Sequence, residues 1–388
     1  MHARSALRTF ALAALLVLVP VLAAGCGGSD STTGGSTSST GSTSSEKATG
    51  TDVAAAKEFV APLVGQPSPF PVTEKLAELP KPGTNVAFLD LGTPVTALMW
   101  ELLQPAAKTM GINLFRVQAS GVGAISQAMD TIVEKEPDGL IFLAADPTAF
   151  SHQLEELREQ GTIVVAGSIE NGEEFGFETV QFGKPQAIEE GELMAAWTVA
   201  QTNGKAHKIV YYNVPELPFS VVVKEGVESK LAELCPECEL RVSDIPLAEV
   251  GKNASGRVVS DLQANPDTEF ALFPNDEMQL GLPAALETAG IEIERFGSGP
   301  TPGNLEAVQK GEEKAVLAVD VPTLVWTMVD QFARELAGQK LTGLEKEGDI
   351  VKQFLTARDL EGTNPELGWA GYPDFPVRFA KLWGVTGQ

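Results

Sequence analysis

The chain has 388 residues, of which 52 are Asp or Glu and 28 are Lys or Arg, so its formal net charge is -24. Nucleic acid and anionic lipid head groups would repel so acidic a surface, which excludes both as partners. The chain is long enough to form two lobes rather than one core.

The N-terminus has the pattern of a secretory signal peptide. Arg4 and Arg8 precede an apolar segment over residues 10–22. This segment is too short to cross a bilayer, which needs about 20 predominantly apolar residues. We therefore expect residues 1–25 to be removed on export and the protein to act at the outer face of the cytoplasmic membrane, at the cell surface or in the periplasm.

The sequence Leu22-Ala23-Ala24-Gly25-Cys26 resembles the lipobox of bacterial lipoproteins, in which the cysteine is lipidated before cleavage in front of it. It departs from the usual pattern at Ala23, where Leu is common. We expect a lipid on Cys26, with ordinary secretory cleavage near Ala24 as the alternative. The lipid would be the only contact with the membrane.

Two further segments precede the folded region. Residues 26–52 are almost entirely Gly, Ser and Thr after the cysteine, which predicts a disordered tether. Residues 53–83 are expected to form an N-terminal helix and a proline-rich lead-in.

The two other cysteines, Cys235 and Cys238, are separated by Pro-Glu. An exported protein meets oxidising conditions, so a local disulfide is the leading interpretation. A redox pair and half of a zinc site are the alternatives. Because no second cysteine pair exists and the chain has only three histidines, we predict no metal site and no cofactor.

From residue 85 onward, short apolar segments alternate with helical patterns, which predicts parallel sheets covered by helices. The expected strands are 85–91, 113–118, 139–145, 162–166, 208–213, 239–245, 269–274, 291–296 and 314–319. The expected helices are 96–110, 124–136, 149–160, 221–234, 256–264, 278–289 and 322–337. The fold class is therefore α/β, with two similar doubly wound parallel-sheet lobes. Ligands bind such sheets beyond the C-terminal ends of the strands, so two facing lobes would form a cleft.

Several motifs are similar to those of the sugar-type periplasmic binding proteins, the ribose-binding-protein group with the type I fold. They are Asn265-Pro266-Asp267, the segment from Ala271 to Met278, Asp146-Pro147-Thr148, Thr301-Pro302 and the segment from Lys314 to Pro322. The resemblance covers about residues 85–343.

The resemblance implies that the chain crosses between the lobes near residues 180–183, near 320–322 and again after 343. The N-lobe would comprise residues 84–181 and 321–347, and the C-lobe residues 182–320 and 348–388. Crossings of this kind make a hinge that supports closure of the lobes around a ligand.

In the family, an aromatic ring stacks on the sugar, and Asp and Arg side chains bind its hydroxyl groups. This chain has no aromatic residue in the loop from Gly92 to Thr96, has Gly167-Ser168 in place of an Asp-Arg pair and has Gly299 in place of an Asp. We therefore expect a ligand that is less hydroxylated than a simple sugar. The candidate ligand-binding residues are Thr93, Val95, Thr96, Asp146, Ser168, Phe182, Phe219, Asn275, Ser298 and Asp320. Helix capping is the alternative role for Asp146 and Asn275.

No nucleophile elbow, phosphate-binding loop, H-E-x-x-H pair or dinucleotide fingerprint occurs in the sequence, which argues against an enzyme. The resemblance implies a monomeric, lipid-anchored solute-binding protein that delivers a small molecule, sugar-like or less polar, to the permease subunits of an ABC importer. Two alternatives remain, a lipoprotein that senses a ligand for a membrane receptor and an anchored hydrolase with paired carboxylates.

Overall fold

The computed structural model describes residues 50–119 and 121–385. The predicted signal peptide, Cys26 and most of the predicted tether lie outside these residues. Among the described residues, no helix is both long and apolar enough to cross a bilayer.

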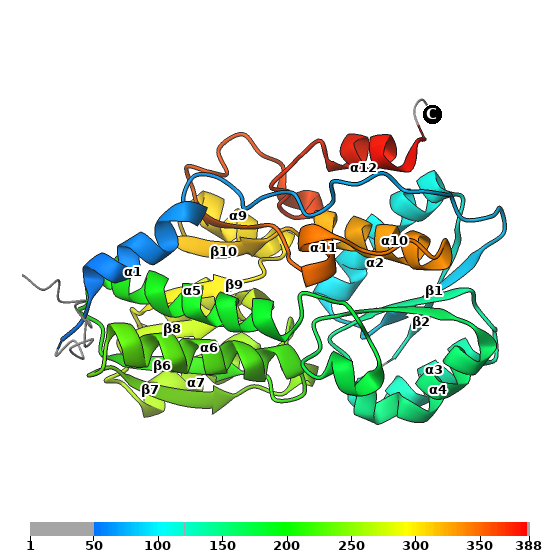
Figure 1. Cartoon of the computed structure of the whole chain (residues 1–388). Coiled ribbons are helices and arrows are strands. Elements are labelled where there is room, and N and C mark those ends of the chain that lie inside the picture. Colours follow the sequence, from blue (N-terminus) through cyan, green and yellow to red (C-terminus); the bar gives the residue numbers. More distant parts are fainter. Residues whose placement is uncertain (1–49, 120, 386–388) are drawn as a thin grey trace, which may run out of the picture. The chain divides into compact units, whose positions relative to one another are not determined.

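The N-lobe (Figure 1) contains a parallel sheet. The sheet has five strands in the order β2-β1-β3-β4-β5. Its strands are β1 (Asn85–Asp90), β2 (Asn113–Gln118), β3 (Gly139–Leu143), β4 (Ile163–Gly167) and β5 (Val180–Gln181). Its helices include α2 (Pro94–Met110), α3 (Ile125–Val133), α4 (Ser151–Gln160) and α10 (Val321–Leu336). The inner strands β1, β3 and β4 are largely apolar because both faces of the sheet are covered, one by α2 and α10 and the other by α3 and α4.

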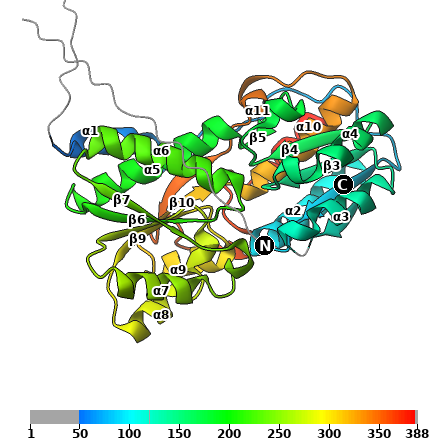
Figure 2. The same ribbon diagram turned by 90° about the horizontal axis from the view of Figure 1, so that it is seen from below.

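The C-lobe contains a six-stranded sheet with the order β11-β10-β9-β8-β6-β7. Its strands are β6 (Lys208–Asn213), β7 (Glu239–Asp244), β8 (Phe270–Phe273), β9 (Glu294–Ser298), β10 (Ala315–Val319) and β11 (Lys352–Thr356), of which β11 runs antiparallel to β10. Helices α5 (Lys184–Thr202) and α6 (Pro218–Leu234) cover one side of this sheet (Figure 2). Helices α7 (Ala254–Ala264), α8 (Leu282–Ala289) and α9 (Pro302–Lys310) cover the other side.

All nine predicted strands and all seven predicted helices are present, with ends shifted by a few residues. The prediction of two doubly wound α/β lobes is confirmed. The sequence-based interpretation missed α5, the short strand β5, the antiparallel strand β11 and two helices near the end of the chain, α11 (Gly343–Glu347) and α12 (Phe375–Trp383).

The missed helix α5 is buried on most of its circumference because it packs against the sheet, against α6 and against α1 (Val53–Val60). Its buried residues therefore form no single apolar stripe, which is the pattern that identifies a helix from sequence. Close packing against α6 depends on two glycines. A Cβ atom at Gly191 would lie 2.0 Å from the Val223 carbonyl oxygen, and one at Gly226 would lie 2.1 Å from the Ile188 carbonyl oxygen.

The chain segments that connect the two lobes are hydrogen-bonded to one another. The Phe182 N–H donates to the Gly348 carbonyl oxygen at 2.7 Å, and the Asp320 N–H donates to the Val351 carbonyl oxygen at 2.8 Å. The lead-in joins this group, since the Ser68 N–H donates to the Lys352 carbonyl oxygen at 3.0 Å.

The end of the chain differs from the predicted domain assignment. We expected residues 348–388 to belong to the C-lobe, but α12 lies against the N-lobe. The reason is aromatic packing, because Trp326 of α10 stacks on Trp383 with ring centroids 5.2 Å apart and also contacts Phe379. The apolar face of α12 is therefore buried against the N-lobe.

Cys235 and Cys238 are joined by a disulfide in the structure, between the end of α6 and the start of β7. His207 and Glu237 lie close to the Cys235 sulfur. Because that sulfur is part of the disulfide, it offers no thiolate to a metal ion.

Candidate functional site

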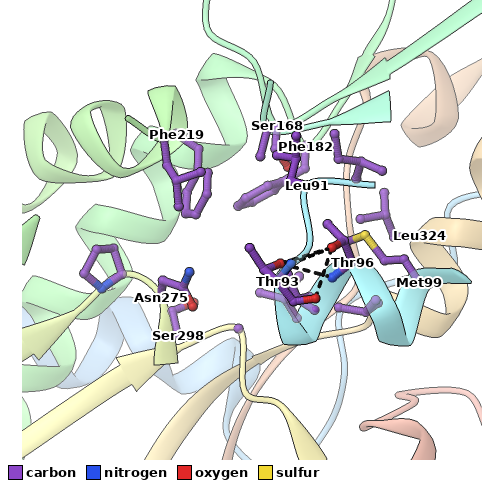
Figure 3. A pocket seen from close by; sticks show the side chains of 18 of the residues that line it. Leu91, Thr93, Thr96, Met99, Ser168, Phe182, Phe219, Asn275, Ser298 and Leu324 are labelled. Carbon is purple, nitrogen blue, oxygen red and sulfur yellow. Dashed lines mark hydrogen bonds between the residues drawn. The ribbon is translucent and has the colours of Figure 1, made fainter. Parts of the chain in front are cut away.

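A cavity of about 100 Å³ lies between the C-terminal edges of the two sheets (Figure 3). Residues from both lobes and from the connections between them line it. They are Leu91, Thr93, Val95, Thr96, Met99, Leu143, Ala144, Ser168, Phe182, Glu190, Leu217, Phe219, Pro274, Asn275, Ser298, Gly299, Val319, Val321 and Leu324. Most of these side chains are apolar, five are polar and uncharged, and Glu190 is the only ionisable residue among them.

The start of α2 forms the N-lobe wall of the cavity. Thr93 caps the helix and forms a capping box with Thr96. The Thr96 hydroxyl also donates to Asp90 Oδ1 at 2.6 Å, and it accepts the Thr93 N–H at 3.0 Å. Both hydroxyl groups are therefore occupied by the fold itself. What this wall offers to a solute is mainly the apolar surface of Val95 and Met99.

Three residues of the lining have strained backbones. Ala144, Ser168 and Phe182 each have a φ of 54°, in the left-handed region that residues with a side chain rarely adopt. Hydrogen bonds to neighbouring segments hold them there, including the one from the Ser168 N–H to the Gln181 carbonyl oxygen at 2.9 Å. Only two other non-glycine residues in the described part of the chain have a positive φ. Strain of this kind clusters at ligand-binding sites.

The C-lobe wall carries polar groups at the ends of its strands. Asn275 follows β8, and its Oδ1 atom accepts the Glu277 N–H at 3.1 Å, capping the short 3-10 helix η6 (Asp276–Gln279). Its amide nitrogen has no hydrogen-bond partner within residues 50–119 and 121–385. Ser298 ends β9. In Figure 3, Asn275 and Phe219 face Thr93 and Thr96 across the open space.

Glu190 lies in the second turn of α5 and is only 2% exposed. Burial raises the pKa of its carboxyl group to about 7, although the Ser298 hydroxyl and the Lys352 ammonium lower it. The next residue, Gly191, sits where α5 and α6 are in closest contact, and this contact fixes the position of the carboxyl group. Glu190 is therefore a rigidly placed acid in a mainly apolar cavity.

The sequence-based interpretation did not include Glu190 because it missed the helix that carries it. The sequence nevertheless contains residues typical of the two ends of a helix. Pro185 stands in the first turn of α5, and Asn203 adopts the left-handed conformation that ends it, with Gly204 next.

Eight of the ten predicted ligand-binding residues line the cavity. They are Thr93, Val95, Thr96, Ser168, Phe182, Phe219, Asn275 and Ser298. The other two predicted residues, Asp146 and Asp320, do not line the cavity in the structure, and both cap helices. Asp146 Oδ1 accepts the Thr148 N–H at 2.9 Å, and Asp320 accepts the N–H groups of Thr323 at 2.7 Å and Gly371 at 2.9 Å.

One hydrogen bond joins the two lobes beside the cavity. Glu277 Oε1 in η6 accepts the Val95 N–H, in the first turn of α2, at 2.6 Å. Glu277 is buried, and burial raises its pKa to about 7, whereas the bond from Val95 lowers it and Asp276 raises it further. An ionised carboxylate at a helix N-terminus also interacts favourably with the helix dipole. This contact stabilises the arrangement in which the lobes enclose the cavity.

Residues 86–340, well over half of the chain, match the model of the periplasmic binding protein domain. The comparison with curated proteins gives no significant match. Several solved structures have the same fold. The 5-methylthioribose transporter solute-binding protein of Thermotoga lettingae is 16% identical, with a TM-score of 0.62, and the alignment covers 78% of this chain and 95% of that one.

Two more of these structures contain sugars. A solute-binding protein of Burkholderia graminis in complex with D-arabinose is 13% identical, with a TM-score of 0.63, over 74% of this chain and 100% of that one. A solute-binding protein of Actinobacillus succinogenes with bound D-allose is 18% identical, with a TM-score of 0.61, over 72% of this chain and 99% of that one. At these identities the likeness shows the fold alone.

Proposed function

Since the chain belongs to the periplasmic binding protein domain family, we propose that it is a lipid-anchored solute-binding protein that captures a small molecule between its lobes and delivers it to an ABC importer. The type I fold expected from the sequence motifs is confirmed by the family match and the similar structures. The family consists of extracytoplasmic binding proteins. Membership of this family confirms the prediction of a binding protein rather than an enzyme.

The cavity is the observation that carries this proposal. It lies at the C-terminal ends of both sheets, where ligands bind in doubly wound folds, and both lobes contribute to it. Hydrogen-bonded connections between the lobes supply the hinge. A solute that contacts both walls binds the closed form better than the open form, and it therefore shifts the population toward closure.

Anchoring and delivery are supported by the sequence. A lipid on Cys26 followed by a Gly, Ser and Thr tether would keep the binding lobes near the membrane and free to reorient. The closed lobes would then dock on permease subunits in that membrane. Replacement of Cys26 by Ser should release the protein from the membrane fraction, whereas continued sedimentation with membranes would contradict lipid anchoring.

The proposal is tested by native mass spectrometry of the purified protein before and after denaturation, which identifies any solute that it carries. We expect a small non-covalent adduct on the wild type and none on Val95→Trp, because an indole at that position fills the cavity. Val377→Trp is the matched control, since Val377 is also helical but is 70% exposed on α12. An adduct that persists in Val95→Trp, or chemical turnover of the solute, would contradict the proposal.

A further inference from the structure

We propose that the cavity selects a solute with an apolar body and one protonated amine, and that Glu190 binds the ammonium group. This inference rests on the proposed function and specifies the ligand class of the same site. The ionisable lining residue, the aromatic rings beside it and the charges behind it all favour a cation.

The charge of the lining favours a cation and disfavours an anion. Among the residues that the structure describes, no Lys, Arg or His lines the cavity, so a carboxylate or phosphate entering it would lose its hydration without gaining a counter-ion from them. Glu190, in contrast, is a buried acid that faces the space. A ligand that brings a positive charge supplies the partner that a buried carboxylate needs.

The charges behind Glu190 do not neutralise it. Lys352 is the nearby cation, and it is 2% exposed. Its ammonium group already contacts Glu189 Oε2 at 2.5 Å and Asp349 Oδ1 at 3.2 Å. One ammonium is thus shared among three carboxyl groups when Glu190 is counted, so the cluster has an excess of negative charge.

Uncharged groups complete the surroundings of this carboxyl group. The Ser298 hydroxyl of β9 lies beside Glu190 and lowers its pKa. Tyr211 of β6 packs nearby, but its hydroxyl donates to the Ser220 carbonyl oxygen at 2.6 Å. Burial therefore remains the dominant effect on the pKa of Glu190, which is about 7. An ammonium in the cavity would offset that effect and favour the ionised form.

The remaining lining suits the rest of such a molecule. Figure 3 shows the rings of Phe182 and Phe219 pointing into the same space from opposite sides. Aromatic faces attract ammonium groups and also pack against hydrocarbon. The hydroxyl oxygen of Ser298 can accept a further N–H bond from the ligand. A polyhydroxylated sugar would instead find that the Thr93 and Thr96 hydroxyls are already engaged by the fold.

The inference is tested by titration calorimetry of the purified protein with three ligands of matched shape. They are isopentylamine, isopentanol and isovalerate, which are cationic, neutral and anionic at pH 8. We expect the amine to bind about tenfold more tightly than the alcohol, and the anion more weakly than both. A panel of ribose, galactose, glucose and xylose runs in parallel. Tighter binding of the alcohol, the anion or any of these sugars would overturn the inference.

Matched substitutions on α5 assign the effect to one side chain. Glu190→Gln should weaken amine binding about tenfold and change alcohol binding less than threefold. The control is Glu189→Gln, because Glu189 contacts Lys352 but does not line the cavity. This substitution should change the affinities for the amine and for the alcohol by less than threefold. Equal effects of the two substitutions on amine binding would show that Glu190 does not contact the ligand.

The pH dependence separates ligand binding from a structural role. Between pH 8 and pH 6, amine affinity should fall in the wild type, because Glu190 takes up a proton, and should stay constant in Glu190→Gln. Glu190→Gln should also raise the melting temperature of the empty protein at pH 8 by a few degrees. A lower melting temperature at pH 8 would show that Glu190 is mainly a partner of Lys352, which overturns the inference.

Failure of the inference is distinguishable from failure of the proposed function. Closure of the lobes around a sugar without amine binding would overturn the inference alone. Absence of any carried solute, together with absence of closure on every probe, would overturn both.

Discussion

The two walls of the cavity differ in how their polar groups are used. On the N-lobe wall, the Thr93 and Thr96 side chains form a capping box at the start of α2. The Thr96 hydroxyl also donates a hydrogen bond to the buried Asp90. On the C-lobe wall, Glu190 and the amide nitrogen of Asn275 face the space and remain available to a solute. We infer that the C-lobe wall recognises the polar end of the ligand, while the N-lobe wall closes over its apolar part.

The largest expected effect concerns the placement of the C-lobe wall. Gly191→Ala should lower the free energy of unfolding by about 3 kcal/mol, because the new methyl group would lie 2.0 Å from the Val223 carbonyl oxygen and push α5 away from α6. Solute binding should fall with it, since Glu190 moves with α5. Chemical denaturation measures the change. Gly123→Ala, at a site with no atom near the new methyl group, is the control and should cost under 1 kcal/mol.

The next effect is a pH dependence of stability that arises from buried acids of the C-lobe. Burial raises the pKa of Glu190 and of Glu277 to about 7, above the unfolded value near 4.5. The native state therefore binds more protons than the unfolded state between these pH values. The contribution of these two acids to the free energy of unfolding is therefore largest near pH 4.5. It is lost as the pH rises through 7.

We expect the free energy of unfolding to be about 2 kcal/mol lower at pH 8 than at pH 5.5, a value below the sum of both full shifts because partial solvation reduces them. Denaturant titrations at both pH values measure it. The double variant Glu190→Gln, Glu277→Gln should lose the part of this difference that these two acids contribute, whereas Asp276, whose pKa burial also raises to about 7, should retain its own part. A protein that is equally stable at both pH values would contradict the assignment of buried, poorly compensated acids to this wall.

A third prediction compares one polar residue from each wall. Asn275→Ala should weaken binding of the carried solute about tenfold, because it removes an amide that faces the cavity. Thr96→Val should instead lower the free energy of unfolding by about 1.5 kcal/mol, because Asp90 loses a donor and α2 loses part of its cap. Calorimetry and denaturation, applied to both variants, give the comparison. Weaker solute binding by Thr96→Val together with unchanged binding by Asn275→Ala would contradict these roles of the two walls.

The smallest expected effect is on closure itself. Glu277→Ala removes the acceptor for the Val95 N–H and should shift the equilibrium toward the open form by about 1 kcal/mol. Single-molecule fluorescence between labels on the two lobes reports the populations. Glu277→Gln, which keeps an acceptor oxygen, is the control and should shift the population less. An unchanged population in Glu277→Ala would exclude this contact as a latch.

Much of this organisation is predictable from sequence because it is local. Apolar segments bounded by turn residues identify strands, and the polar residues that follow them lie at the cavity, as Asn275 and Ser298 do. Asp146 and Asp320 also follow strands, but a short acid before a helix caps it as readily as it binds a ligand. The sequence pattern does not separate these two roles.

Other features depend on contacts between distant parts of the chain. Glu190 was missed because α5 is buried on several sides and shows no single apolar face. The position of α12 depends on Trp326, which lies more than fifty residues before Trp383. The residues of α12 form an amphipathic pattern that the sequence-based interpretation did not identify, and only the fold determines which lobe this helix covers.

The most direct test of solute binding between the two walls is hydrogen–deuterium exchange of the purified protein with and without the solute that it carries. We expect slower exchange at both walls, over residues 91–99 and over 182–191 together with 274–279, and no change over 375–383 of α12. Protection confined to one lobe, or located away from the cavity, would contradict binding between the lobes.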